Sequence, residues 1–373
     1  MKHNTLIFSI IVTILCLIPA CSSEKDLLEK ELGPFSKYKN NAVYSIIMIP
    51  DTQRYFRAKS GPDIFQNKIN WITKWSKTLN VRFITHIGDV IEDGMNDINH
   101  KEWKESHKIL SALDNFSKKS LIPYSISLGD HDYNGNERPD MGYTGFVKYY
   151  GKKRYKDFKW YGGSSNTETS HFQFFTANGR KILHINLECD APRNTAFPKE
   201  EDQLKWAQSI INKYPGIPVL LSTHAYITDE AKNGKFIGHE PSPEVKKKNR
   251  RKGENRRGGV EIWKELVSQN DAIFMVLCGN YHEFNNRKGD TGEYHQVSKN
   301  NKGRSVVEIL ANYQGYPNGG DGLFRIITMD EINNKIIVKT YSTYHKKFRK
   351  KMLKTPRTSE FIIPFNFKKR LSL

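Results

Sequence analysis

The feature that most constrains this chain is a series of short apolar runs, each followed closely by an aspartate or a histidine. A single Asp after a strand is ordinary turn chemistry, but five such runs are hard to explain as turns. In open α/β sheets, ligand-binding side chains gather beyond the carboxyl ends of the strands. The runs and the side chains that follow them are Ala42–Ile49 with Asp51, Val81–Ile87 with Asp89, Pro123–Leu128 with Asp130, Val219–Ser222 with His224, and Ala272–Leu277 with His282.

Helical patterns alternate with these runs. Asp63–Leu79 and Lys101–Phe116 show apolar residues at helical spacing, and Glu200–Lys213 and Val260–Gln269 follow later. Strand-like runs also cover Lys181–Leu187 and Ser305–Leu310, and Phe324–Thr328 with Lys335–Tyr341 predicts a hairpin around Asn333–Asn334. The alternation of strands and helices predicts an α/β sandwich.

The N-terminus reads as an export signal. Lys2 precedes the apolar stretch Leu6–Ile18, which is too short for a comfortable membrane span, and Ile18-Pro19-Ala20-Cys21 resembles a bacterial lipobox. We therefore expect residues 1–20 to be a lipoprotein signal peptide, Cys21 to carry the lipid anchor, and residues 21–40 to be a tether. The chain would then be an exported cell-envelope lipoprotein on the periplasmic side or the cell surface, and a plain secretory cleavage site is the alternative.

Charge and composition limit the partners. The 373 residues carry 59 Lys+Arg against 40 Asp+Glu, a net charge of +19 that attracts polyanions or only keeps the protein soluble. The run Lys246–Arg257 is the densest basic segment, and we read it first as a solvated loop and second as a polyanion contact. The apolar share of 37% excludes a disordered chain, and four Cys exclude a disulfide scaffold. The sequence implies no obligate protein partner.

The residues after the strands resemble the motifs of the calcineurin-like metallophosphoesterases, from about Val43 to Tyr341. Gly88-Asp89-Val90-Ile91-Glu92 and Ser222-Thr223-His224-Ala225 match family motifs, and three other motifs match in part. Pro50-Asp51-Thr52-Gln53 is similar to the first motif of one bacterial branch of the family. The segments Ala311–Gly315 and Asn318–Arg325 also resemble sequences of that branch. The resemblance implies an αββα sandwich of two mixed sheets flanked by helices over residues 41–350, with 351–373 as a basic C-terminal extension.

The same resemblance implies the roles of the site residues. Asp89 would bridge two divalent metal ions, and a water or hydroxide between the ions would attack phosphorus. His131 would protonate the leaving group, and Asp132 would orient its imidazole. The first metal would take Asp51, His282 and Gln53, and the second would take Asp130, His224 and Asn280.

Three ligand positions differ from the family pattern. Gln53 and Asn280 stand where the family has histidine, and Asp130 stands where it has asparagine. An oxygen-rich site favours Mn, Mg or Ca over Zn. Zn and Fe remain alternatives for the identity of the metal ions. The leading hypothesis is a phosphoester hydrolase. The alternative is a degenerate, non-catalytic lipoprotein that holds a polyanion at the cell surface.

Overall fold

The computed structural model describes residues 23–94, 100–135, 141–193, 195–196, 199–232, 235–239, 256–282, 292–349 and 358–372. The expected signal peptide, Cys21 and residues 246–255 of the basic run lie outside these ranges. None of the helices in the described ranges is long and apolar enough to cross a membrane.

Two seven-stranded mixed sheets form the centre of the fold. The first has the order β17-β16-β15-β1-β2-β3, with β18 paired to β16. The second has the order β13-β14-β12-β9-β6-β5-β4. The strands of the first sheet are β1 (Val43–Ile49), β2 (Val81–His86), β3 (Tyr124–Ile126), β15 (Leu323–Asp330), β16 (Lys335–Ser342), β17 (Lys347–Phe348) and β18 (Glu360–Pro364). Those of the second are β4 (Tyr161–Ser164), β5 (His171–Ala177), β6 (Arg180–Asn186), β9 (Val219–Ser222), β12 (Ile273–Cys278), β13 (Glu293–Lys299) and β14 (Ser305–Ala311).

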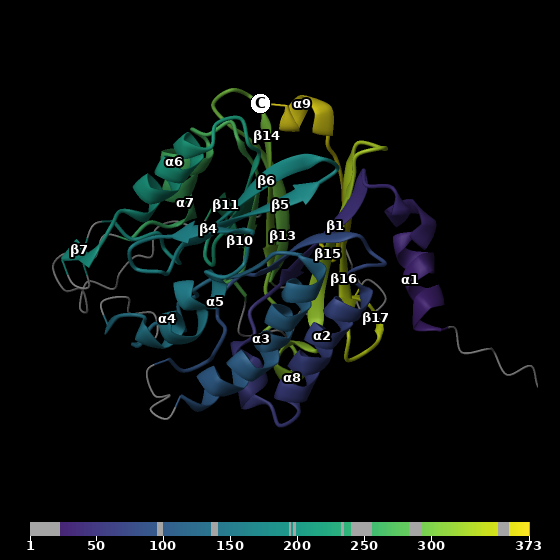
Figure 1. Ribbon diagram of the computed structural model, residues 1–373, viewed down its shortest axis with the longest axis horizontal. Coiled ribbons are helices and arrows are strands. Elements are labelled where there is room, and N and C mark those ends of the chain that lie inside the picture. The colour runs from purple at the N-terminus through teal and green to yellow at the C-terminus, as the bar shows by residue number, and fades with distance from the viewer. Residues whose placement is uncertain are drawn as a thin grey trace, which may run out of the picture. The chain divides into compact units, whose positions relative to one another are not determined.

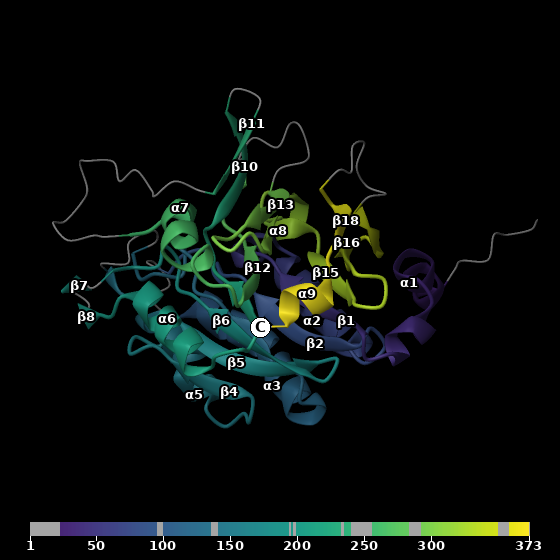
Figure 2. The same cartoon turned by 90° about the horizontal axis from the view of Figure 1, so that it is seen from above.

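The remaining elements are helices and two small hairpins. The hairpin of β10 and β11 projects from the body of the fold (Figure 2). The hairpins are β7 (Thr195–Ala196) with β8 (Lys199–Glu200) and β10 (Ile227–Lys232) with β11 (Lys235–His239). The helices are α1 (Glu24–Leu32), α2 (Gly61–Trp75), α3 (Lys101–Ser120), α4 (Thr144–Tyr150), α5 (Lys152–Tyr155), α6 (Gln203–Lys213), α7 (Gly259–Ile262), α8 (Pro317–Gly320) and α9 (Phe367–Leu371), the 3₁₀ helices η1 (Phe35–Lys39) and η2 (Gln53–Arg57), and the π-helix η4 (Trp263–Val267).

The two sheets pack face to face and are covered by helices on their outer faces. The core between them joins Ile46 and Phe83 of the first sheet to Phe175 and Leu277 of the second. On the outside of the first sheet, Trp71 of α2 contacts aromatic residues of β15 and β16. On the second, α6 and η4 share a core with β6, β9 and β12, and Figure 1 shows α6 and α7 on that side. The predicted αββα sandwich is therefore confirmed.

The central strands run parallel, and this brings the chemistry-bearing loops together. Strand β1 pairs in parallel with β2, and β2 with β3, so that Ile49, His86 and Ile126 lie in register. In the second sheet β14, β12, β9 and β6 are likewise parallel neighbours. All residues of β1 and β12 are buried, which explains why these strands read as continuous apolar runs.

The segments expected to be a tether and a C-terminal extension both contain regular secondary structure. The chain divides into two units, Met1–Pro34 and Phe35–Leu373. Within the expected tether, residues 24–32 form the helix α1, which Ser23 caps through a capping box. The η1 helix belongs to the larger unit, where the Tyr38 hydroxyl lies 3.2 Å from Thr328 Oγ1.

The segment after residue 357 is also part of the fold. Strand β18 pairs with β16 over five residues, and Phe361, Ile363 and Phe365 enter the core between the sheets. In α9, the Arg370 guanidinium donates to the carbonyl oxygens of Ser305 and Asp271. Residues expected to form a basic extension are therefore packed in the core, because alternate side chains from Phe361 to Phe367 are buried.

Candidate metal centre

Three aspartates converge beyond the carboxyl ends of β1, β2 and β3. Asp51 and Asp89 are almost fully buried, and Asp130 is partly buried. Asp89 has a φ of 51°, a left-handed conformation that Asp tolerates better than most residues. Gly129 permits the close approach of the third loop, because a Cβ there would lie 2.1 Å from the Asp89 amide nitrogen. The three carboxylates therefore lie together because the parallel register aligns the ends of their strands.

His224 reaches this cluster from the second sheet. Its Nδ1 lies 2.9 Å from the Ile87 carbonyl oxygen, so that Nδ1–H donates and the ring orientation is fixed. Its Nε2 lies 3.1 Å from both Asp89 Oδ1 and Asp130 Oδ1. Gly88 makes room for the ring, since a Cβ there would lie 2.5 Å from Nδ1.

Two groups of potential metal ligands result, and they share Asp89. The first is Asp51, Asp89 and His224, and the second is Asp89, Asp130 and His131. Within each group one ligand atom per residue lies within 4.8 Å of the others. A shared carboxylate is the arrangement that a two-metal site requires.

Gln53 lies in the same cluster. Its Nε2 donates to Asp89 Oδ2 over 2.6 Å, and its side chain is fully buried. Within the described part of the chain, Gln53 Oε1 and Asp51 Oδ1 are buried without a hydrogen-bond partner. Buried oxygens of this kind carry a desolvation cost that a bound cation would offset.

The electrostatics of the cluster also favour a cation. Burial raises the pKa of Asp51 well above its usual value, and the neighbouring Asp89 adds to this, while His224 opposes it. Burial lowers the pKa of His224, but Asp89 and Asp51 outweigh it and raise that pKa well above the usual value. The site thus concentrates negative charge, so its residues fit divalent metal ions.

His131 and Asp132 do not interact as the sequence suggested. The Asp132 carboxylate accepts hydrogen bonds from the backbone amides of Val90, Ile91 and Gly129, at 2.8–3.1 Å. It therefore holds the second and third loops together instead of orienting the His131 ring. The expected role of Asp132 is corrected because three backbone donors occupy its oxygens.

A backbone carbonyl group fixes the orientation of the His131 ring. Its Nδ1 lies 2.8 Å from the Glu92 carbonyl oxygen, and its amide donates to Asp89 Oδ1 over 3.0 Å. Burial alone would lower the pKa of His131, but Asp89 and Asp130 raise it to about 9. The imidazole is therefore protonated at neutral pH in the metal-free protein.

Asn280 and His282 occupy the loop after β12. The backbone N–H of Asn280 donates to Asp51 Oδ2 over 3.0 Å, and Asn280 has a left-handed φ of 65°. His282 Nδ1 lies 3.2 Å from the Asn280 carbonyl oxygen. Both residues are partly buried, and neither belongs to the two ligand groups above. The loop is thus tied to the first metal position through Asp51.

Two residues after β14 support His282, and sequence reasoning had assigned them no role. The Asn312 side-chain amide donates to the Asn280 carbonyl oxygen over 2.8 Å. Gln314 Nε2 lies 3.0 Å from His282 Nδ1. Because β14 is the parallel neighbour of β12, the two loops meet at the same edge. The Ala311–Gly315 motif was the available signal for this contact.

The end of the basic run is not solvated. Arg257 is buried and bonded to Asp202 over 2.8 Å and to Glu265 over 2.7 Å. Arg256 pairs with Asp190 over 3.1 Å. The expectation of a solvated loop is therefore wrong for these two arginines. They fix this segment to the loop after β6, beside the metal centre.

Comparisons with known proteins identify the family. The model of the family described as calcineurin-like phosphoesterase matches residues 44–252, more than half of the chain. The chain therefore belongs to the calcineurin-like phosphoesterase family.

Individual relatives are more distant. The chain is 30% identical over 304 residues to the "Uncharacterized protein YvnB" of Bacillus subtilis (strain 168). The match covers 82% of this chain but only 20% of that protein, so the chain spans about a fifth of its relative's length. A purple acid phosphatase, PPD1 from yellow lupin (Lupinus luteus) seeds, is similar in structure with a TM-score of 0.43 and 12% identity, over 89% of this chain and 55% of the other.

Proposed function

We propose that the protein is a metal-dependent phosphoester hydrolase. The observation that carries the proposal is the pair of ligand groups that share the buried Asp89. The membership of the family supports the same reaction class. Two ions in such a site would polarise the phosphoryl group and activate a water molecule.

The residues divide into two ligand sets around Asp89. By resemblance to the family motifs, Asp51 would hold the first ion with Gln53 and His282, and Asp130 and His224 would hold the second with Asn280. The geometric groups differ from these sets in one respect, because they place His224 with Asp51 and Asp89 and place His131 with Asp89 and Asp130. Asp51 Oδ1 and Gln53 Oε1 are the oxygens best suited to a cation, because no hydrogen bond within the described ranges occupies them. The ligands are mainly oxygens, so Mn or Mg is favoured over Zn.

His131 would serve as the general acid. Its Nδ1–H donates to the Glu92 carbonyl oxygen, which leaves Nε2 as the nitrogen that can deliver a proton to the leaving oxygen. In the metal-free protein the carboxylates of Asp89 and Asp130 raise the pKa of His131, which favours the protonated ring. Asp132 contributes indirectly by holding the loop on which His131 stands.

A metal add-back assay tests this proposal. The protein is stripped with a chelator and then assayed on bis(4-nitrophenyl) phosphate and on 4-nitrophenyl phosphate with Mn, Mg, Ca, Zn or Fe. We expect turnover only with metal, most strongly with Mn or Mg. Absence of turnover with every ion, in protein whose circular dichroism shows a folded state, would refute hydrolysis and favour a non-catalytic binding protein.

We also propose that the protein is an exported lipoprotein anchored through Cys21. The lipobox-like Ile18–Cys21 supports this location. In cells that express the full chain, the wild-type protein should sediment with membranes and the Cys21→Ser variant should not. Equal distribution of the two would overturn the proposed anchor.

A polyanion contact through the basic run is proposed for Lys246–Lys252 only, since Arg256 and Arg257 are engaged in ion pairs. Binding to heparin should weaken steeply with salt. Replacing Lys246, Lys247 and Lys248 with Gln should reduce the slope of that salt dependence. An unchanged slope would remove the contact.

A further inference from the structure

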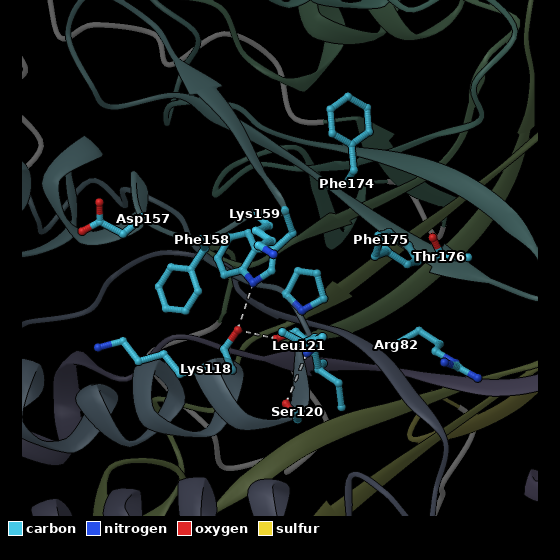
Figure 3. A pocket seen from close by; sticks show the side chains of 14 residues that line it. Arg82, Lys118, Ser120, Leu121, Asp157, Phe158, Lys159, Phe174, Phe175 and Thr176 are labelled. Carbon is cyan, nitrogen blue, oxygen red and sulfur yellow. Dashed lines mark hydrogen bonds between the residues drawn. The ribbon is translucent and has the colours of Figure 1, made fainter.

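Strand β2 has a basic side chain near each of its ends, and the two differ in their surroundings. Arg82, near the start, lines a hollow of about 550 Å³ whose other walls come from α3, β5 and the loop before β4 (Figure 3). His86, at the end, is fully buried and lies in register with Ile49, the last residue of β1. Its imidazole therefore stands at the point where the loops with Asp51 and Asp89 begin.

The hydrogen bonds of His86 fix its tautomer. The backbone N–H of Gly88 donates to Nδ1 over 3.2 Å, so Nδ1 carries no proton. Burial, together with the charges of Lys68 and His224, lowers the pKa of His86 to about 3. A neutral imidazole whose Nδ1 accepts a hydrogen bond carries its proton on Nε2. That N–H donates to Thr52, whose Oγ1 lies 2.9 Å from Nε2.

The Thr52 hydroxyl connects His86 to the turn after β2. Since Oγ1 accepts from His86, its own proton can donate to the Val90 carbonyl oxygen at 3.2 Å or to the Asp89 carbonyl oxygen at 3.4 Å. The backbone N–H of Thr52 donates to the same Asp89 carbonyl oxygen over 2.9 Å. Thr52 is fully buried, and it thus binds two successive carbonyl groups at the residue that both ligand groups share.

The turn at Asp89 needs this support because its backbone is unusual. Gly88 has a φ of 106°, and Asp89 follows with a φ of 51°, which costs a residue other than glycine free energy. Strained conformations persist only where the surroundings over-determine them. His86 accepts from the N–H of Gly88, and Thr52 binds the carbonyl groups. The Asp132 carboxylate accepts from the next two N–H groups, so the orientation of Asp89 is set jointly by these three side chains.

We propose that His86 and Thr52 are positioning residues for the bridging carboxylate of Asp89. The neutral His86 imidazole orients the Thr52 hydroxyl, and the hydroxyl fixes the turn that directs Asp89 to both metal positions. The inference rests on the proposed two-metal site. It adds that both ions depend on an uncharged chain of hydrogen bonds that begins in β2, although neither His86 nor Thr52 is a metal ligand.

Calorimetric titration of the metal-stripped protein with Mn²⁺ tests the proposal. Thr52→Val removes the hydroxyl at nearly constant volume, and we expect both binding events to weaken about tenfold, because Asp89 belongs to both ligand groups. Thr52→Ser keeps the hydroxyl and should retain the wild-type affinity. Thr328→Val is the matched control, since it removes another buried hydroxyl, which lies 3.2 Å from that of Tyr38. It should lower the melting temperature without changing the Mn²⁺ affinity.

A double-mutant cycle tests whether His86 acts through Thr52. His86→Asn keeps an acceptor for the Gly88 N–H but removes the donor to Thr52, so it should weaken Mn²⁺ binding about tenfold. The double variant with Thr52→Val should bind Mn²⁺ no more weakly than either single variant, since all three interrupt one chain of hydrogen bonds. If His86→Asn fails to fold, the comparison of Thr52→Val with Thr52→Ser decides the proposal.

An unchanged Mn²⁺ affinity in folded Thr52→Val would overturn the proposal, as would an equal loss of affinity in Thr328→Val. Additive losses in the double variant, about a hundredfold in total, would show that His86 does not act through Thr52. Weakening of only one binding event would assign Thr52 to one ion and not to the shared Asp89. The proposed function fails differently: a wild-type protein that hydrolyses no phosphoester, but whose Mn²⁺ affinity depends on Thr52, would refute the hydrolase and support the positioning role.

Discussion

The two flanks of the metal centre are built by different interactions. On one flank, His224 is fully buried and lies 3.1 Å from the carboxylates of Asp89 and Asp130. On the other, His282 is partly buried, and its Nδ1 lies 3.2 Å from the Asn280 carbonyl oxygen and 3.0 Å from Gln314 Nε2, of which it can bond only one at a time. Contacts between an imidazole and two carboxylates position His224 on the first flank. Contacts with uncharged amide and carbonyl groups position His282 on the second. We infer that the first flank holds its metal ion more tightly.

The largest expected effect comes from the residue that both flanks share. Asp89→Asn keeps the left-handed backbone, which Asn also tolerates, but removes one charge from both ligand groups. We expect phosphoesterase activity to fall by about 10³-fold or more, which corresponds to roughly 4 kcal/mol of lost transition-state stabilisation. Asp63→Asn, on the exposed first turn of α2, is the control and should retain activity. Activity within tenfold of wild type in Asp89→Asn would disprove the bridging role.

The second prediction compares the flanks directly. His224→Gln should reduce activity by about 10²-fold and His282→Gln by about tenfold, because His224 contacts two carboxylates and His282 is held mainly by amides. Metal content after dialysis, measured ion by ion, should fall further in His224→Gln. The reverse order of losses would contradict the inference that charge makes the tighter flank. His345→Gln, on the turn after β16, serves as the distant control.

The third prediction concerns the amide support of His282. Gln314→Ala should weaken the affinity of the weaker metal ion about tenfold, because it removes the side chain that orients the ring. Calorimetric titration of the stripped protein with Mn²⁺ measures the effect, and the tighter binding event should be unchanged. Gln66→Ala, on α2, provides the matched control. Equal weakening of both binding events in Gln314→Ala would mean that the flanks are not independent.

The last prediction concerns stability and not activity. Lys68 is a buried residue of α2 whose Nζ lies 4.6 Å from the Tyr55 ring centroid. Burial lowers the pKa of Lys68 to about 7, and the charge of Asp51 opposes this shift. Between pH 7 and about 10.4, the usual lysine pKa, the unfolded state binds more protons than the folded state. Stability therefore rises with pH in this window, by at most about 1.4 kcal/mol per pH unit.

The Lys68→Met variant isolates that contribution. Chemical denaturation of the metal-free protein at pH 7 and pH 9 should show a stability gain for wild type that is larger than for Lys68→Met. The exposed Lys74→Met on the same helix should behave as wild type. Parallel pH dependences in wild type and Lys68→Met would show that Lys68 stays charged beside Asp51.

The sequence predicted the strands that carry the site because they are buried on both faces and read as apolar runs. The runs at 42–49, 81–87 and 219–222 correspond closely to β1, β2 and β9. It did not predict β5 or β13 as strands, because polar and charged residues interrupt their apolar ones. It also missed β18, whose apolar run Phe361–Ile363 is only three residues long before Pro364. It also missed the burial of Arg257, since a basic run gives no sign of the acidic residues that meet it across the fold.

By itself, the sequence determined which residue types stand at the ends of the strands, and with them the prediction of an oxygen-rich metal site. The tertiary structure decided how these residues pair. Parallel register within each sheet brought Asp51, Asp89 and Asp130 together, and the packing of the two sheets brought His224 to them. Parallel register within each sheet also placed Asp132 against backbone amides of the loop after β2, and His282 against Gln314 of the loop after β14. Residue spacing fixes the position of a side chain along its own strand, but its partners come from other strands and are set only when the sheets assemble.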